Sequence, residues 1–309
     1  MYKVLVSCPP MLKMIDRFRE DFKKYELDFD VVETVQTLTE EEIKKILPKY
    51  DGWILGDDPA NEEVLKVGKS GKLKAIVKWG VGTDNVNFDA AQNLNIKATN
   101  TPGMFGDEVS DVAIAYLLGL ARHTYYIDRN VRQGEWPKPA GSSLKNKCLG
   151  IVGLGDIGKN IAKKASVFGL SLIGWDPFIE PKLKELHQEK NWPNGLEKCD
   201  FIIFSCSLND RTKYMFNNSL KNKIKKKISV INVSRGKLID EKFLEELINE
   251  NLLQGLAMDV FETEPPNISD RIFSFENSIF GSHNASNTIE AVEKTSVVAI
   301  KYIGGMLNE

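Results

Sequence analysis

A glycine-rich segment after an apolar run is the feature that most constrains the fold of this chain. The run Leu149–Val152 has the character of a buried strand, and the motif GLGDIG follows it at residues 153–158. A helical pattern, Lys159–Phe168, comes next, so the segment predicts a strand, a tight turn and a helix. Such a unit is stable only within a larger parallel sheet, which predicts an α/β fold.

Strand-like runs alternate with helical patterns from end to end, as expected for βαβ units. The strand-like runs are Lys3–Ser7, Asp30–Val35, Gly52–Leu55, Lys74–Lys78, Leu149–Val152, Ser171–Trp175, Phe201–Ser205, Ser229–Val233 and Gly255–Met258. The helical patterns include Ile15–Tyr25, Thr39–Leu47, Asp107–Arg122 and Thr288–Leu307. Boundary signals lie at Thr101–Gly103 and near Ser286. They predict a discontinuous domain, residues 1–100 and 287–309, with a second domain, residues 101–286, inserted in it.

Composition excludes several classes of protein. Hydrophobic residues make up 42% of the 309 residues and the net charge is −2, so no strong positive field is available for nucleic acid. The basic run Lys221–Lys227 predicts a solvated loop. The longest apolar stretch, Val112–Ala121, is too short for a membrane span, and the N-terminus lacks signal-peptide character. Four cysteines without CxxC spacing predict buried, reduced thiols, no metal site and a cytoplasmic protein.

The glycine motif has the spacing of a dinucleotide site. Gly153 permits the tight turn, Gly155 lets the backbone approach a pyrophosphate, and Gly158 allows close packing of helix on strand. The helix N-terminus favours the anion. Asp176 ends the next strand-like run, where a carboxylate accepts hydrogen bonds from the ribose and repels a 2′-phosphate. We therefore expect NAD as the cofactor.

Only three histidines occur, and one of them follows a strand-like run. His283 comes just after Ser278–Phe280, where the end of a strand presents a side chain to a crevice. His123 closes a helical pattern and is expected to have a structural or surface role. His187 lies in the charged stretch Lys182–Lys190, which predicts a solvated helix face. Hydride transfer to a keto acid needs a proton donor, and histidine suits that task near neutral pH.

Arg235 and Glu264 complete this chemistry. Each follows a strand-like run, and the carboxyl ends of parallel strands share one edge of a sheet. A glutamate orients a histidine ring and stabilises its charged form. A forked arginine holds a substrate carboxylate and polarises the carbonyl beside it. By spacing alone, each could equally be an ordinary loop charge.

Several ordered motifs together resemble the D-isomer-specific 2-hydroxyacid dehydrogenase family over nearly the whole chain. They are GVGTDNV at 80–86, NTPG at 100–103, the glycine motif with its strand at 150–158, INVSRG at 231–236, Met258–Pro266 and His283. The resemblance implies an NAD-dependent oxidoreductase that interconverts 2-hydroxy and 2-keto acids. It also implies two Rossmann-like doubly wound domains, the cofactor domain inserted in the substrate domain, in a homodimer.

The resemblance implies roles for single residues. The expected catalytic residues are Arg235, Glu264 and His283. The expected cofactor contacts are Gly153, Gly155, Asp156, Ile157, Gly158, Asp176, Val233, Ser234 and Asp259. The expected substrate contacts are Lys78, Val81, Gly82 and Arg235. Ser282 departs from the proline that the family usually has before its histidine.

Within the family, the chain is similar to phosphoglycerate dehydrogenases without a C-terminal regulatory domain and to hydroxypyruvate and glyoxylate reductases. The first similarity predicts 3-phosphoglycerate and phosphohydroxypyruvate as substrates, with Lys78 as either a phosphate ligand or a surface charge. Reduction of hydroxypyruvate or glyoxylate is the alternative. A dehydrogenase of formate or phosphite, or a non-enzymatic NAD-sensing corepressor, is less favoured, since the Arg235–Glu264–His283 set is complete.

Overall fold

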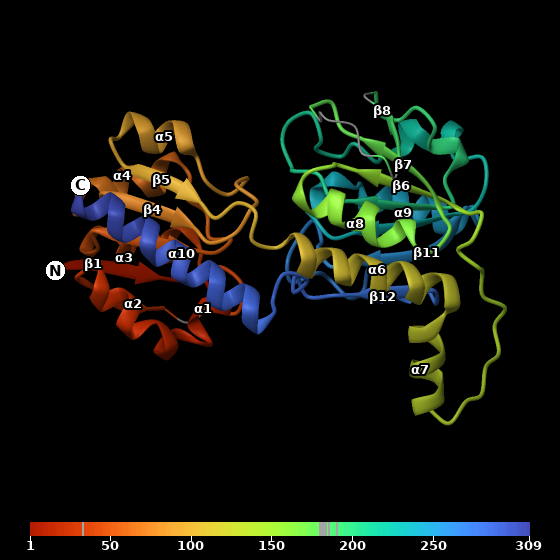
Figure 1. The fold of residues 1–309 in the computed structure, drawn as a ribbon, viewed down its shortest axis with the longest axis horizontal. Helices are drawn as coiled ribbons and strands as arrows, with labels where there is room; N and C mark the ends of the chain where they lie inside the picture. Colours follow the sequence, from red (N-terminus) through yellow and green to blue (C-terminus); the bar gives the residue numbers. More distant parts are fainter. Residues whose placement is uncertain (33, 179–183, 185, 190) are drawn as a thin grey trace. The chain divides into compact units, whose positions relative to one another are not determined.

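The computed structural model describes residues 1–32, 34–178, 184, 186–189 and 191–309, which divide into two compact units (Figure 1). Unit 1 comprises Met1–Met104 and Asn287–Glu309, and unit 2 comprises Phe105–Ser286. Each unit is built on its own parallel sheet with helices packed on it, which confirms the predicted α/β class. Within the described residues, no helix has the length and apolar character needed to cross a membrane.

Unit 1 has a five-stranded sheet in the order β2-β1-β3-β4-β5, with every pair parallel. Its strands are β1 (Tyr2–Val6), β2 (Leu27–Val31), β3 (Gly52–Leu55), β4 (Ala75–Lys78) and β5 (Lys97–Asn100). Strands β3 and β4 are buried along their whole length, as expected for a parallel sheet covered on both faces.

The helices of unit 1 come from both ends of the chain. They are α1 (Pro9–Leu12), α2 (Arg19–Lys24), α3 (Glu40–Ile46), α4 (Glu62–Ser70), α5 (Phe88–Asn93) and α10 (Ile289–Asn308), with 3₁₀ turns at Ile15–Phe18 and Leu47–Lys49. Thr39 caps α3 through a capping box with Glu42, which explains why that helix begins where the sequence predicts. Helix α10 packs on β3 and β4, so the C-terminal segment is part of this unit.

Unit 2 has a seven-stranded parallel sheet in the order β12-β11-β10-β9-β6-β7-β8. Its strands are β6 (Cys148–Val152), β7 (Ser171–Trp175), β8 (His187–Glu189), β9 (Phe201–Phe204), β10 (Ile228–Asn232), β11 (Leu253–Met258) and β12 (Ser278–Phe280). The chain order reverses between β6 and β9. That reversal is the kind of switch point at which open α/β sheets bind ligands.

Unit 2 has four α-helices within the described residues. They are α6 (Gly106–Arg122), α7 (Thr124–Arg132), α8 (Asp156–Ser166) and α9 (Glu241–Asn249), with 3₁₀ turns at Leu196–Lys198, Asn218–Lys223, Gly236–Leu238 and Arg271–Ser274. Helix α6 packs on α8, β10 and β11. His123 ends α6 in the left-handed conformation and its Nδ1 lies 3.1 Å from Asn277 Oδ1, which confirms its structural role.

Two local predictions are wrong. The strand expected at Asp30–Val35 lies earlier, at Leu27–Val31, because residues 27–31 pair with β1 in register. The helix face expected at Lys182–Lys190 falls partly outside the described residues. Its described part contains the edge strand β8, paired with β7, so sheet pairing overrides the helical character of the charged sequence. His187 is exposed there, with Nε2 at 2.8 Å from Glu189 Oε1.

Candidate active site

The glycine turn joins β6 to α8 in a form that suits a diphosphate. A Cβ on Gly158 would lie 1.9 Å from the carbonyl oxygen of Gly153, so only glycine lets the helix pack this close to the turn. A Cβ on Gly155 would meet no atom within 4 Å, which leaves open space above the turn. Gly155 is also the N-cap of α8 and has no side chain to occupy the first N–H groups, which Asp156 and Ile157 contribute. These groups fit an anionic ligand.

Asp176 stands beside this turn, at the end of β7. Its Oδ2 accepts a hydrogen bond from the N–H of Leu154 at 2.9 Å, and its Oδ1 accepts one from Phe178 N at 2.9 Å. The carboxylate is therefore fixed next to the glycine turn and retains acceptor capacity for a ribose hydroxyl. The turn, the start of α8 and Asp176 together fit the adenosine-diphosphate part of a dinucleotide.

The segment after β10 is held in place by Asn232. Its Nδ2 donates to the carbonyl oxygen of Arg235 at 2.9 Å, and its Oδ1 accepts from Ser234 N at 3.1 Å. Ser234 Oγ donates to the carbonyl oxygen of Cys206, beyond β9, while Val233 is buried. Arg235 Nη1 donates to Ser234 O at 2.8 Å. The contacts with Asn232 and with the backbone oxygen of Ser234 thus position Arg235 at the carboxyl edge of the sheet.

His283 and Glu264 meet at the same edge of the unit 2 sheet. His283 Nδ1 lies 2.7 Å from Glu264 Oε2, and each side chain is 22% exposed. Glu264 Oε1 accepts a hydrogen bond from the N–H of Phe261 at 3.0 Å, which fixes the carboxylate. With Nδ1 against the carboxylate, the ring nitrogen Nε2 is the one that can exchange a proton with a substrate.

Asp259 organises the loop that carries His283. Its backbone oxygen accepts from His283 N at 2.7 Å, and its carboxylate accepts from Asn284 N at 3.2 Å and Ala285 N at 2.9 Å. Asp259 is 2% exposed, and His283 adopts a positive φ of 54°. These bonds stabilise a left-handed backbone that a histidine rarely adopts, so the imidazole has a defined direction.

In unit 1, the loop after β4 presents backbone N–H groups. Gly80 N donates to Thr101 Oγ1 at 2.8 Å, and Asn100 Nδ2 donates to the carbonyl oxygen of Val81 at 3.0 Å. The loop is therefore held by hydrogen bonds from the N–H of Gly80 and to the carbonyl oxygen of Val81. The N–H groups of Val81 and Gly82 donate no hydrogen bond to any residue in the described part of the chain. Two adjacent free N–H groups can bind a carboxylate.

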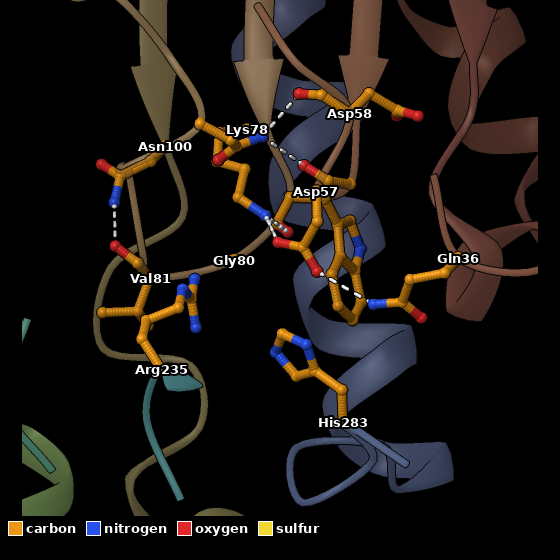
Figure 2. A network of polar contacts seen from close by, with 12 residues as sticks. Gln36, Asp57, Asp58, Lys78, Gly80, Val81, Asn100, Arg235 and His283 are labelled. Carbon is orange, nitrogen blue, oxygen red and sulfur yellow. Dashed lines mark hydrogen bonds and ion pairs between the residues drawn. The ribbon is translucent and has the colours of Figure 1, made fainter. Parts of the chain in front are cut away.

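The surroundings of Lys78 contradict one of its two expected roles, that of a surface charge. It is 3% exposed and so is not a surface charge, and its Nζ lies 2.8 Å from Asp57 Oδ1 (Figure 2). The sequence reasoning missed Asp57. The available signal was a pair of acids, Asp57 and Asp58, just after the buried strand β3.

The comparison with protein families decides the family of this chain. Residues 114–285 match the model described as "D-isomer specific 2-hydroxyacid dehydrogenase, NAD binding domain". The chain belongs to the D-isomer specific 2-hydroxyacid dehydrogenase family. It is therefore an NAD-dependent oxidoreductase, and the fold and cofactor that the sequence predicts are confirmed. NAD fits the residues of unit 2, where the glycine turn, the N-terminus of α8 and Asp176 would hold it.

Named relatives of this family differ in substrate. The chain is 30% identical to a hydroxypyruvate reductase of Thermotoga maritima over 87% of its own length and 89% of the relative. It is also 30% identical to a D-3-phosphoglycerate dehydrogenase of Methanocaldococcus jannaschii, over 99% of its own length but 58% of the relative. Among solved structures, the TT0316 protein of Thermus thermophilus is similar, with a TM-score of 0.86 and 26% identity, covering 99% of this chain and 97% of that one.

Proposed function

We propose that this dehydrogenase reduces a small, unphosphorylated 2-keto acid of the hydroxypyruvate or glyoxylate type to the D-2-hydroxy acid. The hydrogen-bonded pair of His283 and Glu264, 2.7 Å apart, carries the proposal, because reduction of a carbonyl needs a proton donor held at one ring nitrogen. The hydroxypyruvate reductase of Thermotoga maritima, similar over most of both chains, supports the substrate class.

The proposed mechanism assigns one task to each side chain. His283 Nε2 gives its proton to the keto oxygen, and Glu264 stabilises the charged ring through Nδ1. Arg235 binds the substrate carboxylate and withdraws charge from the carbonyl, so the carbon becomes more electrophilic. NADH, when bound, supplies the hydride for that carbon. In the oxidative direction His283 accepts the proton, as the reverse path requires.

The N–H groups of Val81 and Gly82 are also proposed to bind the substrate carboxylate. Their availability in the described structure supports this role, as does the fixation of the loop by Asn100 and Thr101. A backbone site of this kind recognises a carboxylate and makes no demand on the rest of the substrate. Selection of the substrate's side chain must therefore come from other residues.

Phosphohydroxypyruvate is the second candidate, and it is the substrate that the sequence resemblance favours. The phosphoglycerate dehydrogenase of Methanocaldococcus jannaschii, similar over 99% of this chain, supports it. Against it stands the pairing of Lys78 with Asp57, since a lysine that already neutralises a carboxylate offers little charge to a phosphate.

A panel assay separates these candidates. NADH oxidation is followed by its absorbance with hydroxypyruvate, glyoxylate, phosphohydroxypyruvate, pyruvate and 2-ketoglutarate, and NADPH serves as the control cofactor. We expect the highest kcat/KM with hydroxypyruvate or glyoxylate, and a loss of about 100-fold or more in kcat for His283→Ala, the usual contribution of a general acid. A preference for phosphohydroxypyruvate, or full activity of His283→Ala, would refute the corresponding part of the proposal.

We further propose that the enzyme is a homodimer in which α7 contacts a second copy. No residue of α7 is buried, and the helix and the chain after it extend away from the rest of unit 2 (Figure 1). Val131 is 42% exposed and Trp136 is 77% exposed. Apolar side chains of this size gain stability when a partner covers them.

A further inference from the structure

The pair of Lys78 and Asp57 occupies the carboxyl edge of the unit 1 sheet. Lys78 ends β4, and Asp57 follows the neighbouring strand β3. Their side chains are 4% and 31% exposed, so the ammonium is buried whereas the carboxylate still reaches solvent. Ligands of open α/β sheets bind beyond the carboxyl ends of the strands. Of the two groups, it is the carboxylate that a ligand at this edge can reach.

The charges around Lys78 are compensated within unit 1. A buried ammonium requires a partner, and Asp57 supplies it at 2.8 Å. Asp57 Oδ2 is also 3.4 Å from Gln36 Nε2. Asp58 is fully buried and accepts hydrogen bonds from Ser7 Oγ at 2.6 Å and Leu38 N at 2.8 Å. Burial raises the pKa of Asp58, and nearby Lys78 opposes that rise. Lys78, Asp57 and Asp58 together therefore carry no net positive charge that could attract an anionic substrate.

The pair is fixed relative to the carboxylate-binding loop. Asn85 Nδ2 donates to the carbonyl oxygens of Gly56 at 3.0 Å and Asp58 at 2.7 Å, which ties the loop after β4 to the loop after β3. Lys78 Nζ in addition lies 3.4 Å from the backbone oxygen of Trp79, next to Gly80. A substrate carboxylate on Val81 and Gly82 would thus be held at a constant distance from Asp57.

We infer that Asp57, neutralising Lys78, is a specificity-determining residue that selects 2-keto acids with a hydroxyl on the next carbon and rejects those with an anionic side chain. The inference rests on the proposed function. The carboxylate can accept a hydrogen bond from a hydroxyl, because an ionised carboxylate is acceptor-only, with several lone-pair sites, and this side chain is 31% exposed. The same carboxylate repels a phosphate or a second substrate carboxylate. Hydroxypyruvate fits these demands, and phosphohydroxypyruvate does not.

Asp57→Asn tests the inference with little change of shape. The variant loses the negative charge of Asp57 and so removes the ion-pair partner that lies 2.8 Å from the Lys78 ammonium. We expect the kcat/KM ratio of phosphohydroxypyruvate to hydroxypyruvate to rise by about tenfold or more, the effect of one charged hydrogen bond. The ratio of hydroxypyruvate to glyoxylate, which lacks the hydroxyl, should fall. The double variant Asp57→Asn/Lys78→Met has neither charge. Its kcat/KM ratio of phosphohydroxypyruvate to hydroxypyruvate should therefore fall below that of Asp57→Asn.

Asp89→Asn is the matched control, since Asp89 is an acid in the first turn of α5 in the same unit. This variant should have the same kcat/KM as the wild type for hydroxypyruvate, glyoxylate and phosphohydroxypyruvate. If the wild-type enzyme reduces no 2-keto acid, the proposed function fails. If it reduces hydroxypyruvate but Asp57→Asn changes neither ratio by more than about twofold, the inference alone is overturned. Circular dichroism and NADH binding show whether each variant is folded, and Asp57→Ser repeats the test should the asparagine variant fail to fold.

Discussion

The variant Glu264→Gln gives the sharpest test of the proposed proton donor. Glu264 Oε1 accepts from Phe261 N at 3.0 Å, and Oε2 lies 2.7 Å from His283 Nδ1. A glutamine that keeps the Phe261 contact with its oxygen must turn its NH₂ group toward His283. The protonated ring carries a hydrogen on both nitrogens, so two donors then face each other. The charged ring is destabilised without any loss of volume at the site.

The size of the effect follows from the bond that is lost. A hydrogen bond between charged groups contributes about 1.5–3 kcal/mol, which corresponds to roughly a 10- to 150-fold loss in kcat/KM for reduction. Both side chains are 22% exposed, so solvent screening favours the lower half of that range. The rate of oxidation should fall too. The glutamine NH₂ group donates to Nδ1 of His283, so the neutral ring carries its proton on Nε2, the atom that must accept a proton from the hydroxy acid.

Steady-state rates of reduction and oxidation, measured from about pH 5.5 to about pH 9 with saturating cofactor, give the loss directly. Glu262→Gln is the control, because this neighbouring carboxylate accepts hydrogen bonds from Tyr214 Oη and from Glu241 N. We expect the reduction rate of Glu264→Gln to fall most at high pH, where a destabilised charged ring is least populated. A variant with normal NADH binding and rates within about twofold of wild type at every pH would refute the role of Glu264.

Three further predictions concern the cofactor, the assembly and the thiols. Asp176→Asn should raise the NADPH-to-NADH ratio of kcat/KM by about tenfold or more, because it removes a charge that repels a 2′-phosphate; an unchanged ratio would argue against this role. Val131→Asp should convert the dimer into a monomer in light scattering, whereas a wild-type monomer would contradict the proposed dimer. Burial raises the pKa of the Cys8 and Cys206 thiols to about 12, so almost no thiolate exists near neutral pH. These two thiols should resist Ellman's reagent in the native enzyme and react in urea, and rapid labelling of the native protein would be the opposite result.

The sequence predicts the unit 2 sheet well because its signals are local. Strand β7 lies at the predicted residues, and β6, β9, β10 and β11 lie within two residues of them. Each is a short apolar run bounded by turn residues, and burial on both faces leaves little ambiguity. Strand β8 was missed for the opposite reason. Its sequence, His187–Glu189, is polar, and only pairing with β7 makes it a strand.

The candidate site shows the same division between local and distant information. That Arg235, Glu264 and His283 follow strands was evident from apolar runs, and the parallel sheet brings their loops to one edge. The pairing of Glu264 with His283 was a chemical expectation that spacing alone left open, and the structure places the two side chains 2.7 Å apart. The individual roles of these residues in catalysis stay predictions until the variants are measured.

Lys78 shows why substrate choice is harder to predict than reaction type. Lysine at the end of a strand permits either a phosphate ligand or a surface charge, and the outcome depends on Asp57, 21 residues earlier in the chain. Strands β3 and β4 are neighbours with Leu55 opposite Lys78, so the loop after β3 necessarily starts beside the lysine. Once that register is known, an acid two residues beyond Leu55 is within reach of the ammonium. The motifs of the family thus indicate the reaction, whereas the pair that we propose to select the substrate side chain, Lys78 and Asp57, lies outside those motifs.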